Sequence, residues 1–200
     1  MSQVETAFKK LQQAIAMYNE RFGINYELTP GPSDAGRQAL IDALGVEFPK
    51  EYLEALDYFD GFANFGFELD YNLKWGNFVC TGVETLGRLK ELNDFAIPEL
   101  QVTASEILTN PASQPLIVGS TSVPVNKTAK DILIFAIHHD FTWYFDLNPP
   151  PGGKHGQIVC AYLMPGAETV YVVADGFAAF MGVLADAMLK ADPDEDDDDE

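Results

Sequence analysis

Residues that mark disulfide scaffolds, metal centres and nucleic-acid binders are scarce in this sequence of 200 residues. It contains only two cysteines and three histidines, and Cys80 and Cys160 lie too far apart to form a C-x-x-C pair. Both cysteines stand in apolar, strand-like runs, which favours buried free thiols over a disulfide framework or a zinc site. Basic residues number only 12 against 31 acidic residues, so we do not expect nucleic acid as a partner.

A long apolar run is also absent. No window of the sequence approaches the roughly 20 apolar residues that a membrane-spanning helix requires. A secretory signal has a basic start followed by an apolar stretch, and the first residues show neither. We therefore expect a cytoplasmic protein without a membrane partner.

The composition that is present predicts a folded and acidic domain. Hydrophobic residues make up 47% of the chain and charged residues 22%, which is typical of a globular protein. The formal net charge is −19, and eight of the 31 acids lie in residues 192–200. Residues 1–191 keep 23 acids against 12 bases, so the body is acidic without this tail. We predict a disordered tail that serves solubility, attracts a basic partner or mimics nucleic acid.

Helical patterns occupy the first half of the chain. Apolar residues recur every three or four positions over residues 4–22, and Ser2 opens a capping box at the start of this helix. Shorter helices are predicted over residues 33–45, 48–61 and 86–95, each from its apolar spacing and its flanking Pro, Ser or Gly.

Strands are predicted for most of the remainder. Residues 62–82 and 116–119 have the composition of short strands and turns. Four strongly β-forming runs predict an antiparallel meander over residues 132–137, 141–147, 157–163 and 169–174. Asp175 is expected to cap a final helix. N-terminal helices, then a meander, then a C-terminal helix predict an α+β fold and not an alternating α/β fold.

Patterns of catalysis and cofactor binding are missing. The sequence has no phosphate-binding loop, no dinucleotide-binding glycine motif and no nucleophile elbow. His138-His139-Asp140 could bind a metal or carry protons, but its place between two strands favours a plain hairpin turn. Glu68 and Asp70 could form an acid pair, although surface acids this numerous form such pairs by chance. We predict no catalytic residue, no metal and no cofactor.

Aromatic residues beside acids predict a protein interface, because rings supply contact area and carboxylates supply electrostatic steering. The predicted partner-binding residues are Glu68, Asp70, Tyr71, Trp75, Asp140 and Trp143. Trp143 and Tyr144 face opposite sides of one strand, so one of the two rings is expected in the core. The other ring, and Trp75, could belong equally to an interface or to the core.

Five segments, in chain order, resemble four motifs of one family. FPKEYL at 48–53, which leads to Gly61, resembles an L-P-x-x-[YL] helix that ends in N-G. PLIVG at 115–119, followed by DIL at 131–133, resembles an I-P-I-G … G-D strand pair. FDLNPPPGGKHGQIV at 145–159 resembles a D-L-N-P-x-x-G-G-x-x-G-Q-I hairpin, and VADGFAAF at 173–180 resembles a V-A-x-S-F-x-x-F helix start.

The family with these motifs is the SUKH superfamily, which includes fungal regulators of cell-wall glucan synthesis and bacterial immunity proteins that neutralise toxins. The chain departs from its pattern at Phe48, Asp60, Ala129-Lys130 and Asp175-Gly176, where Leu, Asn, glycines and Ser are usual. The motif positions in this chain are Pro49, Gly61, Asp131, Asp146, Gly153, Gly156 and Gln157. Each also has a structural explanation as a helix start, a helix stop or part of a tight turn.

The resemblance implies a SUKH-like α+β domain over residues 46–191, with no catalytic activity and a protein as its partner. A helical extension packed on the domain (1–45) would precede it, and the disordered acidic tail (192–200) would follow. The first hypothesis is an immunity protein whose acidic surface neutralises a basic toxin domain, often a nuclease. The alternative is a regulatory scaffold of the cell-wall regulator type that binds a cellular enzyme or signalling protein. A hydrolase that uses the loop His138-His139-Asp140 is a third hypothesis, and the oligomeric state is open.

Overall fold

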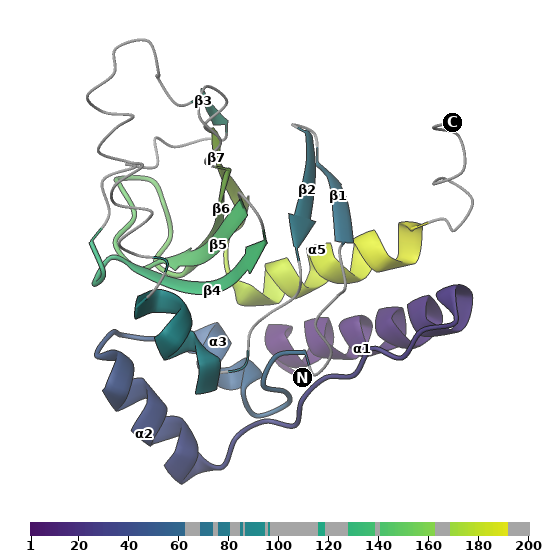
Figure 1. Ribbon diagram of the computed structural model, residues 1–200, viewed down its shortest axis with the longest axis horizontal. Helices are drawn as coiled ribbons and strands as arrows, with labels where there is room; N and C mark the ends of the chain where they lie inside the picture. The colour runs from purple at the N-terminus through teal and green to yellow at the C-terminus, as the bar shows by residue number, and fades with distance from the viewer. Residues whose placement is uncertain are drawn as a thin grey trace.

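The structure is a computed structural model (Figure 1), and it describes residues 1–62, 69–73, 76–80, 85, 87–94, 96, 116–118, 128–138, 141–162 and 169–191. The helices are α1 (Gln3–Phe22), α2 (Asp34–Leu44), α3 (Lys50–Ala55) and α5 (Phe177–Lys190), with a further helical stretch over residues 87–94. The strands are β1 (Leu69–Leu73), β2 (Gly76–Cys80), β3 (Leu116–Val118), β4 (Ile132–His138), β5 (Phe141–Asp146), β6 (Gln157–Tyr162) and β7 (Thr169–Ala174). None of the described helices is both long enough and apolar enough to cross a membrane.

The larger of the two sheets has five strands in the order β3-β7-β6-β5-β4. β4, β5, β6 and β7 pair antiparallel in succession, which confirms the predicted meander and the α+β class. β3 adds a parallel edge strand beside β7, and β1 and β2 form a separate antiparallel hairpin. The sheet and the helices therefore lie in distinct layers, with α1 and α5 side by side beneath the sheet (Figure 1).

Both faces of the sheet are buried. One face belongs to a large apolar cluster that includes Trp143, Phe145 and the buried side of α5. The other face belongs to a smaller cluster that contains Tyr144 and the neighbouring β4 residues Ile132 and Ile134. Alternating side chains point to opposite faces of a strand, so a strand covered on both sides buries all of them. Tyr144 is accordingly 3% exposed and Trp143 is fully buried.

The N-terminal helix α1 follows the sequence prediction closely. The Ser2 side chain accepts a hydrogen bond from the backbone N–H of Glu5 at 3.0 Å, and Gly23 ends the helix with a left-handed φ of 65°. Its apolar face, which includes Phe8 and Leu11, is buried in the same cluster as α3 and α5. The Lys10 ammonium also pairs with Asp186 of α5 at 2.6 Å. α1 therefore forms one wall of the common core.

The helical stretch over residues 87–94 covers the outer edge of β4. The side-chain amide of Asn93 donates to the carbonyl of Ile134 and accepts from its N–H, both at 2.8 Å. Asn93 thus makes the two hydrogen bonds that a neighbouring strand would make at this position. This pairing occupies backbone groups that would otherwise be open to another chain.

Two predictions about helix ends are corrected by the structure. The helix predicted over residues 48–61 is shorter, spans Lys50–Ala55 and has Pro49 as its N-cap residue. Asp175 does not cap α5, whose N-cap residue is Gly176. The carboxylate of Glu51 in α3 instead accepts a hydrogen bond from the Ala178 N–H at 2.9 Å. The Asp175 carboxylate is directed to Lys154 in an ion pair of 2.5 Å.

Candidate functional site

The turn between β5 and β6 is built around a buried carboxylate. Asp146 ends β5, is fully buried and accepts hydrogen bonds from the Gln157 side-chain amide at 3.2 Å and the Asn148 N–H at 3.1 Å. Its backbone carbonyl accepts from the Gly156 N–H at 2.7 Å. The Gln157 side-chain oxygen in turn accepts from the Lys154 N–H at 3.1 Å. These bonds close the loop, because both ends of the turn are attached to one aspartate.

A second aspartate attaches this turn to the start of β4. The Asp131 carboxylate accepts hydrogen bonds from the N–H and the hydroxyl of Thr128, at 2.7 and 2.6 Å, and from the Asn148 side-chain amide at 2.8 Å. Its backbone carbonyl accepts from the Leu147 N–H at 2.7 Å. Asp131 thus joins the turn before β4 to the turn after β5.

Glycine is required where the chain comes close to itself near this turn. A Cβ on Gly153 would lie 2.7 Å from the Cβ of Pro149, which is closer than carbon atoms approach. Gly156 has a left-handed φ of 81°, and a Cβ there would lie 2.7 Å from the Pro49 side chain. Gly61, with a φ of 78°, accepts at its carbonyl from the Thr29 N–H at 2.9 Å. All seven motif positions therefore have contacts that explain them as parts of the fold.

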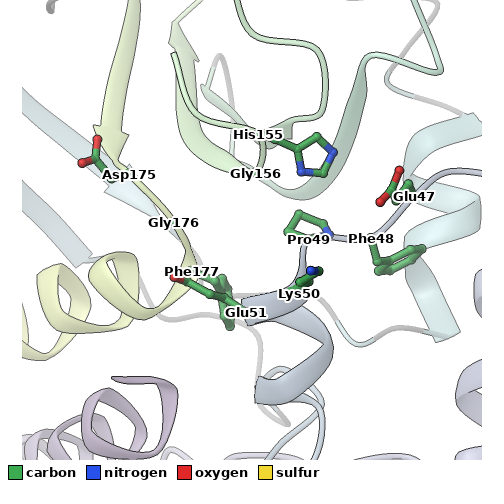
Figure 2. Close-up of a pocket in the computed structure, with 10 residues that line it drawn as sticks. All are labelled: Glu47, Phe48, Pro49, Lys50, Glu51, His155, Gly156, Asp175, Gly176 and Phe177. Carbon is green, nitrogen blue, oxygen red and sulfur yellow. The ribbon is translucent and has the colours of Figure 1, made fainter. Parts of the chain in front are cut away.

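The close packing of Pro49 on Gly156 brings three distant segments around one surface pocket of about 210 Å³. Figure 2 shows the start of α3 below, the turn before β6 above, and the junction of β7 with α5 to one side. The pocket is lined by Glu47, Phe48, Pro49, Lys50, Glu51, His155, Gly156, Asp175, Gly176 and Phe177. Gly176 lies directly against Glu51 in the lining. A Cβ at position 176 would lie 2.5 Å from a carboxylate oxygen of Glu51.

The pocket combines buried aromatic residues with exposed charges. Phe48 and Phe177 are 4% and 0% exposed. Tyr52 stacks on Phe48 and meets Phe177 edge-on, and burial raises the pKa of its hydroxyl well above the usual value. The Tyr52 hydroxyl has no hydrogen-bond partner in the described part of the chain. Because the aromatic rings are packed inward, the charged residues supply the polar contacts that a ligand can make.

The side chains that line the pocket are suited to binding. The lining contains no serine, threonine or cysteine that could act as a nucleophile. Within the described ranges, no group of three or more His, Cys, Asp and Glu residues could hold a metal ion. What the lining does offer is three carboxylates, one ammonium and one imidazole on a small recessed surface.

The partner-binding residues predicted from the sequence do not come together at this pocket. Glu68, Trp75 and Asp140 lie outside the described residues. Asp70 and Tyr71 lie on β1, where their backbones pair with Val79 and Phe78 of β2.

Trp143 requires a correction. Its ring is fully buried and lies 5.8 Å from the ring of Phe180 in α5, so it belongs to the core and offers no contact area to a partner. The reason is that β5 is covered on both faces, whereas the strand pattern placed one of Trp143 and Tyr144 in the core and left the other equally open to an interface or to the core.

Sequence reasoning missed the charged residues of the pocket. Glu47, Lys50, Glu51, His155 and Asp175 were not among the candidate residues, yet all of them line it. A signal was present, because each of these residues lies within two positions of Pro49, Gly156 or Gly176 in the sequence. Their meeting could not be read from the sequence, since it depends on contacts between segments about 20 to 130 residues apart.

Comparison with known families gives one match. A family model described as SMI1 / KNR4 family (SUKH-1) matches residues 31–182. The matched range begins before α2 and ends within α5, so it contains all the residues that line the pocket and leaves α1 outside. No curated protein matches the chain.

Proposed function

Because the chain belongs to the SMI1/KNR4 family (SUKH-1), we propose that it is an immunity protein that binds and neutralises a cognate toxin in the cytoplasm. Domains of this family are of the immunity or regulator type and are generally non-catalytic. Beyond this family assignment, the proposal states that the partner is a basic protein, such as a nuclease toxin domain. It also states that the chain acts by binding and not by catalysis.

The observation that carries the proposal is negative charge without enough positive charge to balance it. The chain has 31 acids against 12 bases. Several of those bases already form ion pairs with acids of the same chain: Lys9, Lys10, Arg37, Lys90 and Lys154. An enzyme that binds nucleic acid needs a basic cleft, and an acidic protein is complementary to such a cleft.

This proposal has a kinetic consequence. Attraction between oppositely charged surfaces raises the rate of association by about 10- to 1,000-fold, and salt screens the attraction. We expect the association rate with the toxin to fall at least about tenfold between about 0.05 M and 0.5 M salt. An association rate that does not change with salt would remove the electrostatic part of the proposal.

The experiment that tests the proposal has two stages. First, the tagged full chain captures partners from its native cells, with washes at low and at high salt and identification by mass spectrometry. Second, the captured protein is expressed in a sensitive host with and without the chain, and growth is measured. A basic protein that stops growth, and that the chain renders harmless, supports the proposal. A captured toxin that remains lethal beside the chain contradicts it.

A second candidate is a regulatory scaffold of the cell-wall regulator type, because the matched family includes regulators as well as immunity proteins. The same capture separates the two candidates. A scaffold would recover a cellular enzyme or signalling protein whose expression alone does not stop growth, and deletion of the chain would change the activity of that partner.

A further inference from the structure

The pocket between α3, β6 and α5 is small and has an apolar floor, as a site for one side chain would. Its volume of about 210 Å³ is below the roughly 300–1,000 Å³ of typical small-molecule sites. Gly156 and Gly176 line it without side chains, and the ring of Pro49 packs against Gly156 (Figure 2). A Cβ on either glycine would collide with Pro49 or Glu51, so the wall of the pocket is tightly packed at both positions. Its apolar part suits the aliphatic stem of a long side chain.

The rim of the pocket carries more negative than positive charge. Carboxylates reach it from three places: Glu47 before α3, Glu51 in the first turn of α3, and Asp175 after β7. Lys50 is the only lysine or arginine among the residues that line it. One oxygen of Glu51 accepts the Ala178 N–H, while Glu47 is exposed and forms no ion pair with another described residue. A positively charged group would therefore be favoured at this rim.

The chain itself places a cation at one side of the rim. The Lys154 ammonium lies 2.5 Å from the Asp175 carboxylate, and the two side chains are 63% and 68% exposed. A pair this open to water holds its two members weakly. A cationic group of another molecule that binds this carboxylate more tightly can therefore displace Lys154 from Asp175.

We infer that this pocket receives one arginine side chain of the protein partner. The stem of the arginine would lie on the apolar floor, and its guanidinium would meet the carboxylates of Glu47 and Asp175. Arginine suits the site better than lysine, because its planar group donates five hydrogen bonds and binds a carboxylate through two of them. The inference rests on the proposed function, since it names the chemistry by which the partner is recognised.

A short peptide tests the inference with the full chain. The probes are acetyl-Gly-Arg-Gly-amide and the same peptide with citrulline, which has nearly the shape of arginine but no charge. NMR of the isotope-labelled chain follows the backbone amides during each titration. We expect saturable shifts at Lys50, Gly156 and Gly176 with the arginine peptide, and at least about fivefold weaker binding of the citrulline peptide. Equal binding of the two peptides would overturn the inference.

Variants with opposite expected effects make the test sharper. The double variant Glu47→Gln with Asp175→Asn should weaken arginine-peptide binding about fivefold. Lys50→Met should strengthen it, because it removes a like charge from the rim. The matched control is Glu20→Gln with Asp42→Asn, which removes the same charge at exposed positions outside the pocket. Glu51 is left intact because it caps α5, and circular dichroism verifies that each variant folds.

The result also separates this inference from the proposed function. If the control variant weakens binding as much as the pocket variant does, binding follows general charge, and the inference is wrong. If a toxin is captured and neutralised while the pocket variant binds it as tightly as the control does, the inference fails alone. If the arginine peptide binds at the pocket but the captured toxin stays lethal, the inference stands and the proposed function fails.

Discussion

Asp146 and Asp175 are both aspartates at the end of a strand, yet they lie in opposite environments. Asp146 is fully buried and accepts hydrogen bonds from Gln157 and Asn148. Asp175 has a side chain that is 68% exposed and pairs with a lysine that is nearly as exposed. A buried carboxylate must be satisfied by fixed donors and so defines the fold. An exposed carboxylate is left to exchange partners and is available for binding.

The largest effect on stability is expected from removing the buried carboxylate of Asp146. Asp146→Ala removes the buried acceptor of the Gln157 side-chain amide, which is itself buried, and should lower the free energy of unfolding by about 3 kcal/mol. Asp146→Asn keeps an acceptor oxygen and should cost less. Urea denaturation followed by circular dichroism measures both. Equal stability of Asp146→Ala and the wild type would show that the polar turn does not support the fold.

The next effect concerns the glycine that joins the buried turn to the pocket. Gly156→Ala should lower the free energy of unfolding by about 2 kcal/mol, because it strains a left-handed residue and drives a Cβ into Pro49. The matched control is Gly182→Ala within α5, where a new Cβ meets no atom within 4 Å. That change should raise stability by about 0.5–1 kcal/mol. Thermal melting of the two variants gives the comparison, and a shift of the same sign in both would contradict it.

A smaller effect of opposite sign is expected for Tyr52. Its buried hydroxyl has no hydrogen-bond partner among the described residues, so Tyr52→Phe should raise the free energy of unfolding by about 1 kcal/mol.

The same substitution also sets a pH dependence. Burial raises the pKa of Tyr52 in the folded state, while the unfolded phenol ionises near its ordinary pKa of about 10. Below that value the phenol is neutral in both states, so its ionisation does not affect stability. As the pH rises above it, only the unfolded chain loses the proton, and the free energy of unfolding falls. Denaturation at pH 8 and above pH 10 should therefore show a smaller alkaline loss for Tyr52→Phe than for the wild type. An equal loss in the two proteins would contradict this account.

The smallest effect on stability is expected at the exposed member of the comparison. Asp175→Asn breaks an ion pair in water and should change the free energy of unfolding by less than about 0.5 kcal/mol. Urea denaturation beside Asp146→Asn makes the matched pair, because the same chemical change is made at a buried and at an exposed aspartate. Similar losses at the two positions would show that burial does not separate their roles.

Much of the fold could be predicted from the sequence because its signals are local. The capping box at Ser2 and the left-handed Gly23 define the ends of α1. The strands β4 to β7 agree with their predicted ranges within a residue, because β-branched and aromatic runs alternate there with strong turn residues. The glycines at 153 and 156 were correctly expected at a tight turn.

The candidate site was much harder to predict, because it depends on contacts between distant segments. Trp143 was proposed for an interface since a strand pattern does not reveal whether one or both faces are covered. Asp175 was expected to cap α5 since it precedes that helix, whereas Glu51, 127 residues from Ala178 in sequence, accepts that hydrogen bond. A local rule names the nearest suitable carboxylate, and here the packing of α3 supplied a different one.

The sequence by itself determined the elements of this protein, the ends of its first helix, its strongly acidic charge and its resemblance to the SUKH superfamily. These features depend on residues that are neighbours along the chain or on composition. Only the tertiary structure decided that both faces of β5 are buried, that α3 caps α5, and that Pro49 packs on Gly156 to form a pocket with an acidic rim. The physical reason is that burial and ion pairing are properties of positions in space, and folding joins segments that periodicity and spacing treat as unrelated.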